Sequence, residues 1–211
     1  MQIIYIYDAL CGWCYGFSPV IEEFAKKHRR ELGVEVLSGG MVMGARVGPI
    51  GQVAGYIKDA YKTVEERTGV KFGKGFLEGI LEPGTAIFDS LPSALAMTVV
   101  KHMQHDLALP FASALQKAVY DTGIEPQDEE AFVELALAHG LDRKEFRRLY
   151  AHEDTRNAAL QEIKLIQGWG IHGFPTVLLH EGDNLALMAQ GYVPLEALEQ
   201  RFELAKKEIA V

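Results

Sequence analysis

Two cysteines three residues apart constrain this chain more than any other feature. Cys11 and Cys14 enclose Gly12 and Trp13, and they are the only cysteines in the sequence. A β-branched and aromatic run, Ile3–Tyr7, precedes them, and apolar residues at helical spacing follow them. This context predicts a strand, a tight turn and a helix, with both sulfurs at the helix N-terminus. Unpaired backbone N–H groups and the helix dipole favour negative charge there.

The predicted position gives the two thiols different roles. Cys11 is outermost, so we expect its sulfur to face solvent and its pKa to be lowered, which makes it the attacking thiolate. Cys14 lies one turn inside the helix and is the resolving thiol. Inert core cysteines or half of a zinc site are alternatives, but zinc usually needs four ligands and no second cysteine pair exists. The motif favours dithiol–disulfide exchange, with no metal and no cofactor besides the redox-active disulfide.

Charge and hydropathy exclude several function classes. The 211 residues carry a formal net charge of −8, so the chain is a poor general binder of nucleic acid or anionic membrane. No apolar run reaches the length of a membrane span. The N-terminal residues lack the basic and apolar regions of a signal peptide, from which we expect a cytoplasmic protein. A C-x-x-C in a cytosolic chain is typical of a redox site rather than a structural bridge.

The first part of the chain predicts a β-α-β unit. Apolar positions after Cys14 recur at helical spacing, with Pro19 inside the pattern, and we expect this helix to end at Gly33. Val34–Leu37 then alternates like a second strand. A right-handed crossover would place this strand parallel to Ile3–Tyr7.

A long helical segment follows, with almost no strand signal. Its apolar stripes are bounded by glycines and by expected capping residues, namely Ser90, Asp128 and Asp142. We expect Lys71–Gly84 to be mainly loop. The pattern predicts a helical subdomain, residues 40–156, inserted into a core formed by residues 1–39 and 157–211. We expect the insertion to act as a lid and substrate selector over Cys11.

The last part of the chain returns to α/β character. A helix around Ile163 leads to a sharp turn, Gly173–Pro175, and two apolar runs then flank Glu181–Asn184. The turn chemistry between these runs predicts an antiparallel hairpin. Pro194 starts a final helix.

This order of elements resembles the DsbA family of the thioredoxin superfamily. Four features carry the resemblance: Cys11–Cys14 after the first strand, the helical insertion, Gly173–Thr176 opening the third strand, and the closing helix. The chain is most similar to the FrnE-like cytosolic branch, whose members are labelled dithiol–disulfide isomerases. The resemblance implies an α/β, thioredoxin-like fold with a large inserted helical subdomain. It also implies thiol–disulfide oxidoreductase activity on protein or small-molecule thiols, with glutathione as one candidate thiol.

The resemblance assigns roles to residues of this chain. It makes Cys11 the nucleophile, Cys14 the resolving cysteine and Pro175 the cis-proline that faces the pair. The expected substrate-binding residues surround these three, namely Gly12, Trp13, His172 and Phe174. The chain departs from periplasmic members, which usually carry proline and histidine between the cysteines and also a signal peptide. The role of periplasmic oxidant therefore does not transfer.

Two other functions stay open at this point. Kappa-class glutathione transferases and hydroxychromene-carboxylate isomerases resemble the same architecture, but they have serine at the position of Cys11 and glutathione supplies the thiol. The other alternative is a non-catalytic binding module that uses Met41–Met43 and a helical groove. The presence of both cysteines favours the redox function over either alternative.

Overall fold

The central sheet of the molecule has four strands. A computed structural model describes residues 1–209, so residues 210–211 of the predicted core range lie outside the description. The strand order is β2-β1-β5-β6, with β1 and β2 parallel and the other neighbours antiparallel. The strands are β1 (Gln2–Tyr7), β2 (Gly33–Ser38), β5 (Thr176–Glu181) and β6 (Asn184–Gln190). The predicted parallel pair and the predicted hairpin are both confirmed.

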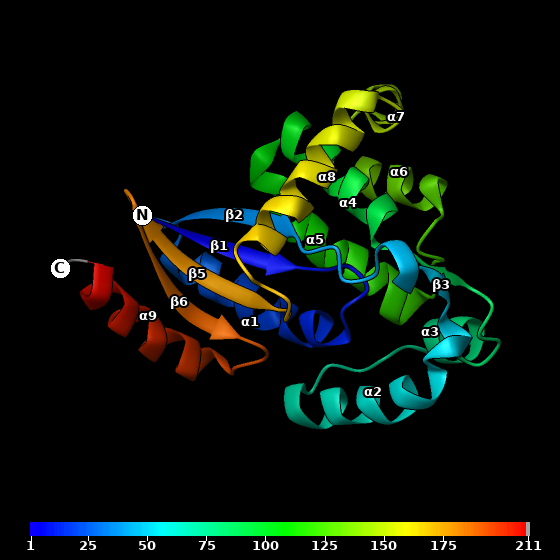
Figure 1. Ribbon diagram of the computed structural model, residues 1–211, viewed down its shortest axis with the longest axis horizontal. Coiled ribbons are helices and arrows are strands. Elements are labelled where there is room, and N and C mark those ends of the chain that lie inside the picture. Colours follow the sequence, from blue (N-terminus) through cyan, green and yellow to red (C-terminus); the bar gives the residue numbers. More distant parts are fainter. Residues whose placement is uncertain (210–211) are drawn as a thin grey trace.

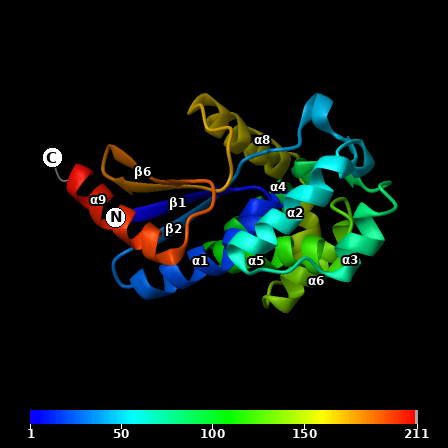
Figure 2. The same cartoon turned by 90° about the horizontal axis from the view of Figure 1, so that it is seen from below.

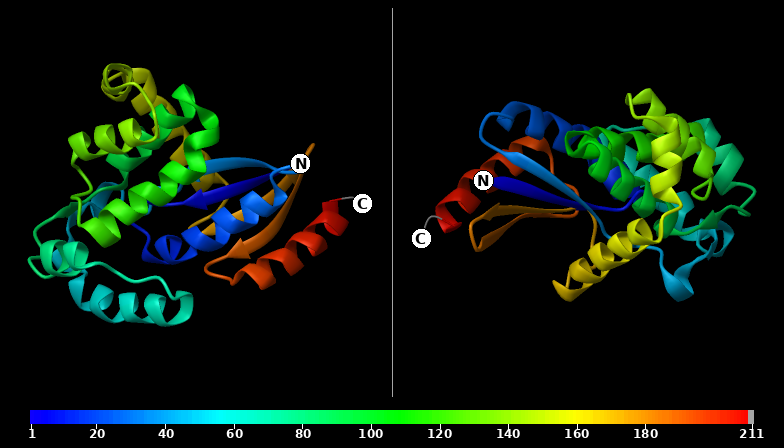
Figure 3. Two further views of the ribbon diagram at one scale, coloured as in Figure 1. Left: turned by 180° about the vertical axis from the view of Figure 1, so that it is seen from behind. Right: turned by 90° about the horizontal axis from the view of Figure 1, so that it is seen from above.

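Helices cover the two faces of this sheet. α1 (Gly12–His28) and α9 (Leu195–Ile209) lie on one face, and α8 (Glu153–Gly168) lies on the other (Figure 1, Figure 3). β1 is buried on both faces, because Tyr5 joins the core on the α1 side whereas Ile6 packs with Ile166 of α8. This burial explains why the strand is a continuous apolar run in the sequence. No helix within residues 1–209 is both long and apolar enough to cross a membrane.

α1 begins at the cysteine motif and ends earlier than the sequence predicts. Its last helical residue is His28, and Arg29 follows as the C-cap. The chain then turns, because the N–H groups of Glu31 and Leu32 both donate to the carbonyl of His28. Gly33 is therefore the first residue of β2, and the prediction that it ends the helix is wrong.

The segment between β2 and α8 is mostly helical, as predicted. The caps Asp128 and Asp142 are confirmed, since their carboxylates accept the N–H groups of Ala131 and Glu145. A ladder of two residues per strand was not predicted, because it is too short to produce an alternating pattern. The elements are β3 (Gly48–Pro49), α2 (Ala54–Thr68), α3 (Lys74–Phe76), β4 (Ile87–Phe88), α4 (Ser90–Met103), α5 (Ala108–Lys117), α6 (Glu129–Ala138) and α7 (Arg143–Tyr150).

Two predictions for this segment are wrong. Lys71–Gly84 is not mainly loop, because α3 continues into a π-helical turn, Leu77–Leu81. α4 is capped by Asp89, whose carboxylate accepts the N–H of Leu91, and not by Ser90. The hydroxyl of Ser90 instead bonds to a residue of the sheet region, which a local capping pattern cannot reveal.

The main hydrophobic core runs through both the sheet region and the inserted segment. It joins Tyr5 of β1 and Phe17 of α1 to Phe111 of α5 and Phe132 of α6. A second cluster lies mostly in the insertion and reaches α1 at Tyr15. Figure 2 shows α2 beside the first half of α1, where the two helices are in contact.

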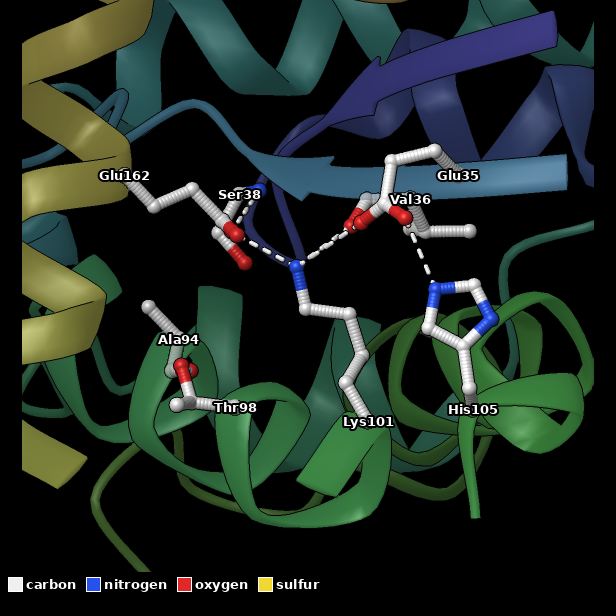
Figure 4. A network of polar contacts seen from close by, with 8 residues as sticks. All are labelled: Glu35, Val36, Ser38, Ala94, Thr98, Lys101, His105 and Glu162. Atoms are coloured by element: carbon white, nitrogen blue, oxygen red, sulfur yellow. Dashed lines mark hydrogen bonds and ion pairs between the residues drawn. The ribbon is translucent and has the colours of Figure 1, made fainter. Parts of the chain in front are cut away.

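A half-buried ion cluster fastens the insertion to the edge strand β2 (Figure 4). The ammonium group of Lys101 on α4 contacts the carboxylates of Glu35 on β2 and Glu162 on α8, and it donates to the carbonyl of Val36 at 2.9 Å. His105 extends the cluster, since its Nε2 lies 2.7 Å from Oε2 of Glu35. The Lys101 side chain is only 13% exposed, so water screens these contacts less than those of a surface pair.

Candidate active site

The sulfur of Cys11 sits at the N-terminus of α1. Cys11 is the N-cap residue in an extended conformation, and its Sγ accepts the N–H of Cys14 at 3.2 Å. Such an N–H is one of the donors that a helix leaves unpaired at its start. Together with the helix dipole it stabilises a negative charge on this sulfur. The predicted strand, turn and helix around the motif are confirmed.

Cys11 is more covered than the sequence suggests. The residue is 4% exposed, so the expectation of a sulfur that faces solvent is wrong. One reason is the loop before β5, because the Cys11 thiol donates to the carbonyl of Phe174 at 3.5 Å. The expected order of exposure still holds, since Cys14 is 0% exposed.

Cys14 differs from Cys11 in its surroundings and in its chemistry. Burial raises the pKa of the Cys14 thiol well above its usual range, and the hydrogen bond with Cys11 and the charge of Cys11 raise it further. A backbone hydrogen bond from Asp8 opposes this rise without overcoming it. Cys14 is therefore a protonated thiol at neutral pH, and both cysteines are free in this structure. Within residues 1–209, no group of three or more His, Cys, Asp or Glu side chains is placed to hold a metal ion.

The loop before β5 faces the cysteine pair. The peptide bond between Phe174 and Pro175 is cis, as expected from the family resemblance. The carbonyl of Pro175 accepts the N–H of Gly191 at 2.7 Å, which ties the loop to the end of β6. The ring of Phe174 lies against Gly39, where a Cβ atom would come within 2.2 Å of the ring. Gly39 thus creates the space that the Phe174 ring occupies, while the carbonyl of Phe174 contacts Cys11.

Asp8 organises the backbone next to the motif. Its carboxylate is buried and accepts three hydrogen bonds, from Leu10 N at 2.9 Å, Met41 N at 2.7 Å and Ser90 Oγ at 3.0 Å. Burial raises the pKa of Asp8, and these hydrogen bonds lower it by a smaller amount. The residue therefore joins the end of β1, the loop after β2 and the start of α4. Its position before the motif was the only sequence signal for this role.

A second polar chain connects the motif to α5. The Ser18 hydroxyl lies 3.2 Å from the Cys14 carbonyl oxygen and 2.5 Å from Oε1 of Gln116. Nε2 of Gln116 donates in turn to the Asp8 carbonyl at 3.3 Å. Gln116 is fully buried, and local patterns give no sign that a glutamine on a helix would reach the first turn of α1.

Most of the predicted substrate-binding residues lie together. Trp13 is half-buried and packs against both core clusters, and its ring centroid is 6.4 Å from that of Tyr192. A Cβ atom on Gly12 would be 3.5 Å from Phe72 of the insertion. Phe174 contacts Cys11 as described above. His172 is exposed in the loop before Phe174, and within residues 1–209 no hydrogen bond or ion pair joins it to either cysteine.

Comparison with known proteins connects this geometry to a family. The model of the DSBA-like thioredoxin domain matches residues 2–203. A search of the curated proteins finds no match. A candidate protein disulfide isomerase from Nitrosomonas europaea has a similar structure, with a TM-score of 0.88, 26% identity and 98% of each chain covered.

The cytosolic disulfide reductase DsbM from Pseudomonas aeruginosa is also similar. Its TM-score is 0.81, with 26% identity and 100% of each chain covered. A structure of the same protein with glutathione (GSH) gives a TM-score of 0.79 over the same coverage. The family match spans nearly the whole chain and includes the cysteine motif and the loop that faces it. The chain therefore belongs to the DSBA-like thioredoxin domain family of thiol–disulfide oxidoreductases, with a thioredoxin-like fold that carries a helical insertion.

Proposed function

We propose that this protein exchanges disulfides through Cys11 as the nucleophile and Cys14 as the resolving cysteine. The observation that carries the proposal is the difference between the two sulfurs. The Cys11 sulfur accepts a helix N-terminal N–H at 3.2 Å, whereas burial raises the pKa of Cys14. A nucleophilic sulfur at the helix N-terminus and a protonated thiol in the same helical turn are the groups that a two-step exchange requires.

In the first step, the Cys11 thiolate attacks one sulfur of a substrate disulfide. A bond forms between that sulfur and Cys11, and the other substrate sulfur leaves with the electron pair. In the second step, Cys14 loses its proton and attacks Cys11, which releases the first substrate sulfur as a thiolate. The substrate has gained two electrons, and the protein holds a Cys11–Cys14 disulfide. Two thiols, such as two molecules of glutathione, then return the protein to the dithiol form.

The surroundings of Cys11 favour a substrate that presents a narrow apolar or backbone segment. The Phe174 carbonyl contacts the sulfur, Trp13 packs against the cluster that contains Cys11, and Phe72 of the insertion lies next to Gly12. We therefore propose Gly12, Trp13, Phe174 and Pro175 as the substrate-contacting residues, with His172 at the outer edge of this region. The position of Phe72 supports the insertion as a selector of substrates.

Glutathione and a cytoplasmic setting fit this proposal. DsbM is named a cytosolic disulfide reductase, and one of its structures was solved with glutathione. A reducing compartment returns a dithiol of this kind to its reduced form between turnovers. We propose glutathione as the electron donor and protein or small-molecule disulfides as substrates, with a redox-active disulfide and no bound cofactor.

A paired assay tests the function and its alternatives. Purified protein is given insulin with dithiothreitol in one assay, and glutathione with an aromatic electrophile in the other. We expect catalysed insulin reduction that is lost in Cys11→Ser. Conjugation of glutathione that survives in Cys11→Ser would favour a glutathione-dependent transferase or isomerase. Absence of both activities would favour the binding module.

A further inference from the structure

The hydroxyl of Tyr5 is buried without a partner in the middle of the core. Tyr5 is 1% exposed, and its hydroxyl makes no hydrogen bond within residues 1–209. A buried polar group of this kind costs stability, and most such groups in proteins are paired. An unpaired hydroxyl in the same buried cluster as a reactive cysteine is therefore a candidate for a hydrogen bond that forms only during the reaction.

The Tyr5 side chain points toward the first turns of α1. Its ring centroid lies 6.0 Å from that of Phe17, which is three residues after Cys14 and shares the buried face of the helix. Tyr5 and Cys14 belong to the same core cluster. Burial raises the pKa of Tyr5 well above its usual range, followed by the charges of Cys14 and Cys11 and a side-chain interaction with Cys14. Tyr5 and Cys14 thus lie in one buried cluster, and no hydrogen bond joins the Tyr5 hydroxyl to the Cys14 sulfur in the reduced protein.

We propose that the Tyr5 hydroxyl donates a hydrogen bond to the Cys14 thiolate whenever that thiolate forms during disulfide exchange. The inference rests on the proposed function, in which Cys14 must carry a negative charge in a fully buried position. A thiol sulfur is a weak acceptor, whereas a thiolate is a strong one. The hydroxyl therefore gains its partner only when the charge appears, and so it stabilises the charged state selectively.

The same hydrogen bond serves both directions of the reaction. When an external thiolate attacks Cys11 of the oxidised protein, the Cys11–Cys14 bond breaks and its electron pair moves to the Cys14 sulfur. Tyr5 keeps its proton, because its pKa is high, and Cys14 is protonated afterwards from solvent. In the reverse direction, the Cys14 thiolate attacks the mixed disulfide at Cys11 and the external sulfur leaves with the electron pair.

The Tyr5→Phe variant tests this inference, because it removes only the hydroxyl. Stopped-flow fluorescence of Trp13 follows oxidised protein mixed with glutathione, and reduced protein mixed with glutathione disulfide. We expect both rate constants to fall about tenfold, because a hydrogen bond to a charged group is lost from both transition states. The equilibrium constant with glutathione should stay unchanged. The variant should be no less stable to urea, since the lost hydroxyl has no partner in the reduced protein.

Tyr7→Phe is the matched control. It removes another buried tyrosine hydroxyl from the same strand and the same face, and Tyr7 is 1% exposed. We expect its rate constants to stay within about twofold of the wild type, since Tyr7 lies at the end of β1, where it pairs with Ser38 of β2. If the wild type exchanges disulfides and Tyr5→Phe does so equally fast, the inference about Tyr5 is wrong and the proposed function stands. A wild type that exchanges no disulfide would overturn the proposed function, and this inference with it.

Discussion

The two cysteines of the motif lie in different surroundings, Cys11 on the outer side and Cys14 on the inner side. On the outer side, Cys11 meets the loop carbonyl of Phe174 and the start of α1. On the inner side, Cys14 is fully buried in the core cluster that also contains Tyr5, and Asp8 is buried nearby. Both residues are almost fully covered, at 4% and 0% exposure, so exposure alone does not separate their roles. The difference is one of electrostatics, because one sulfur accepts an N–H at the helix N-terminus whereas the other lies in a low-dielectric core.

Substitution of either cysteine should have the largest effect on the reaction. Cys11→Ser should abolish turnover, because the thiolate at the helix N-terminus is the attacking group. Cys14→Ser should instead accumulate mixed disulfides between Cys11 and substrate, because the resolving step is lost. Mass spectrometry of protein quenched with acid after incubation with glutathione disulfide distinguishes the two variants. Mixed disulfides on Cys11→Ser, carried by Cys14, would reverse the assignment.

Asp8→Asn tests how much the buried hydrogen bonds of Asp8 contribute to the free energy of unfolding. The amide keeps the size of the carboxylate but replaces one acceptor with a donor, so one N–H donor now faces another. We expect a loss of about 2–3 kcal/mol in the free energy of unfolding, the cost of an unsatisfied buried group. Asp8→Ala, which leaves all three donors unpaired, should lose more.

The stability difference between Asp8→Asn and the wild type should depend on pH. Because burial raises the pKa of Asp8, the wild type is favoured by protonation of this group and loses that stability as pH rises from about 3.9 through the raised value. The asparagine variant lacks this loss. Its deficit in urea unfolding should therefore be larger at about pH 3.5 than at about pH 8. A deficit that grows with pH would show that the carboxylate is stabilised rather than penalised by its site.

Substitutions at two glycines, Gly39 beside the Phe174 ring and Gly12 beside Phe72, should have the smallest effects. Gly39→Ala should cost about 1–3 kcal/mol and slow exchange, since its Cβ would displace the ring of Phe174. Gly12→Ala should stay within about 1 kcal/mol of the wild type, because its Cβ would make an ordinary contact with Phe72. Urea unfolding beside the insulin assay measures both. Equal effects of the two substitutions would show that the Phe174 loop does not depend on Gly39.

Most of the sheet region could be predicted from the sequence, and much less of its connection to the insertion. The strand before Cys11, the hairpin around Gly182 and the parallel β2 follow from short-range patterns that the structure confirms. Asp8, Gln116 and Gly39 gain their roles from residues 33 or more positions away, namely Met41, Ser90, Ser18 and Phe174. Periodicity and capping rules describe neighbours along the chain, so they cannot identify such partners. The burial of Cys11 was missed for the same reason, because the loop that covers it is 163 residues away.

Alkylation of the reduced protein shows which of the two cysteines is the nucleophile. Iodoacetamide reacts with thiolates, so a short pulse at neutral pH followed by peptide mass spectrometry gives the rate at each cysteine. We expect Cys11 to be labelled at least about tenfold faster than Cys14, because burial raises the pKa of Cys14. A urea-unfolded control should show similar rates at both positions. Equal rates in the folded protein, or faster labelling of Cys14, would contradict the assignment of nucleophile and resolving cysteine.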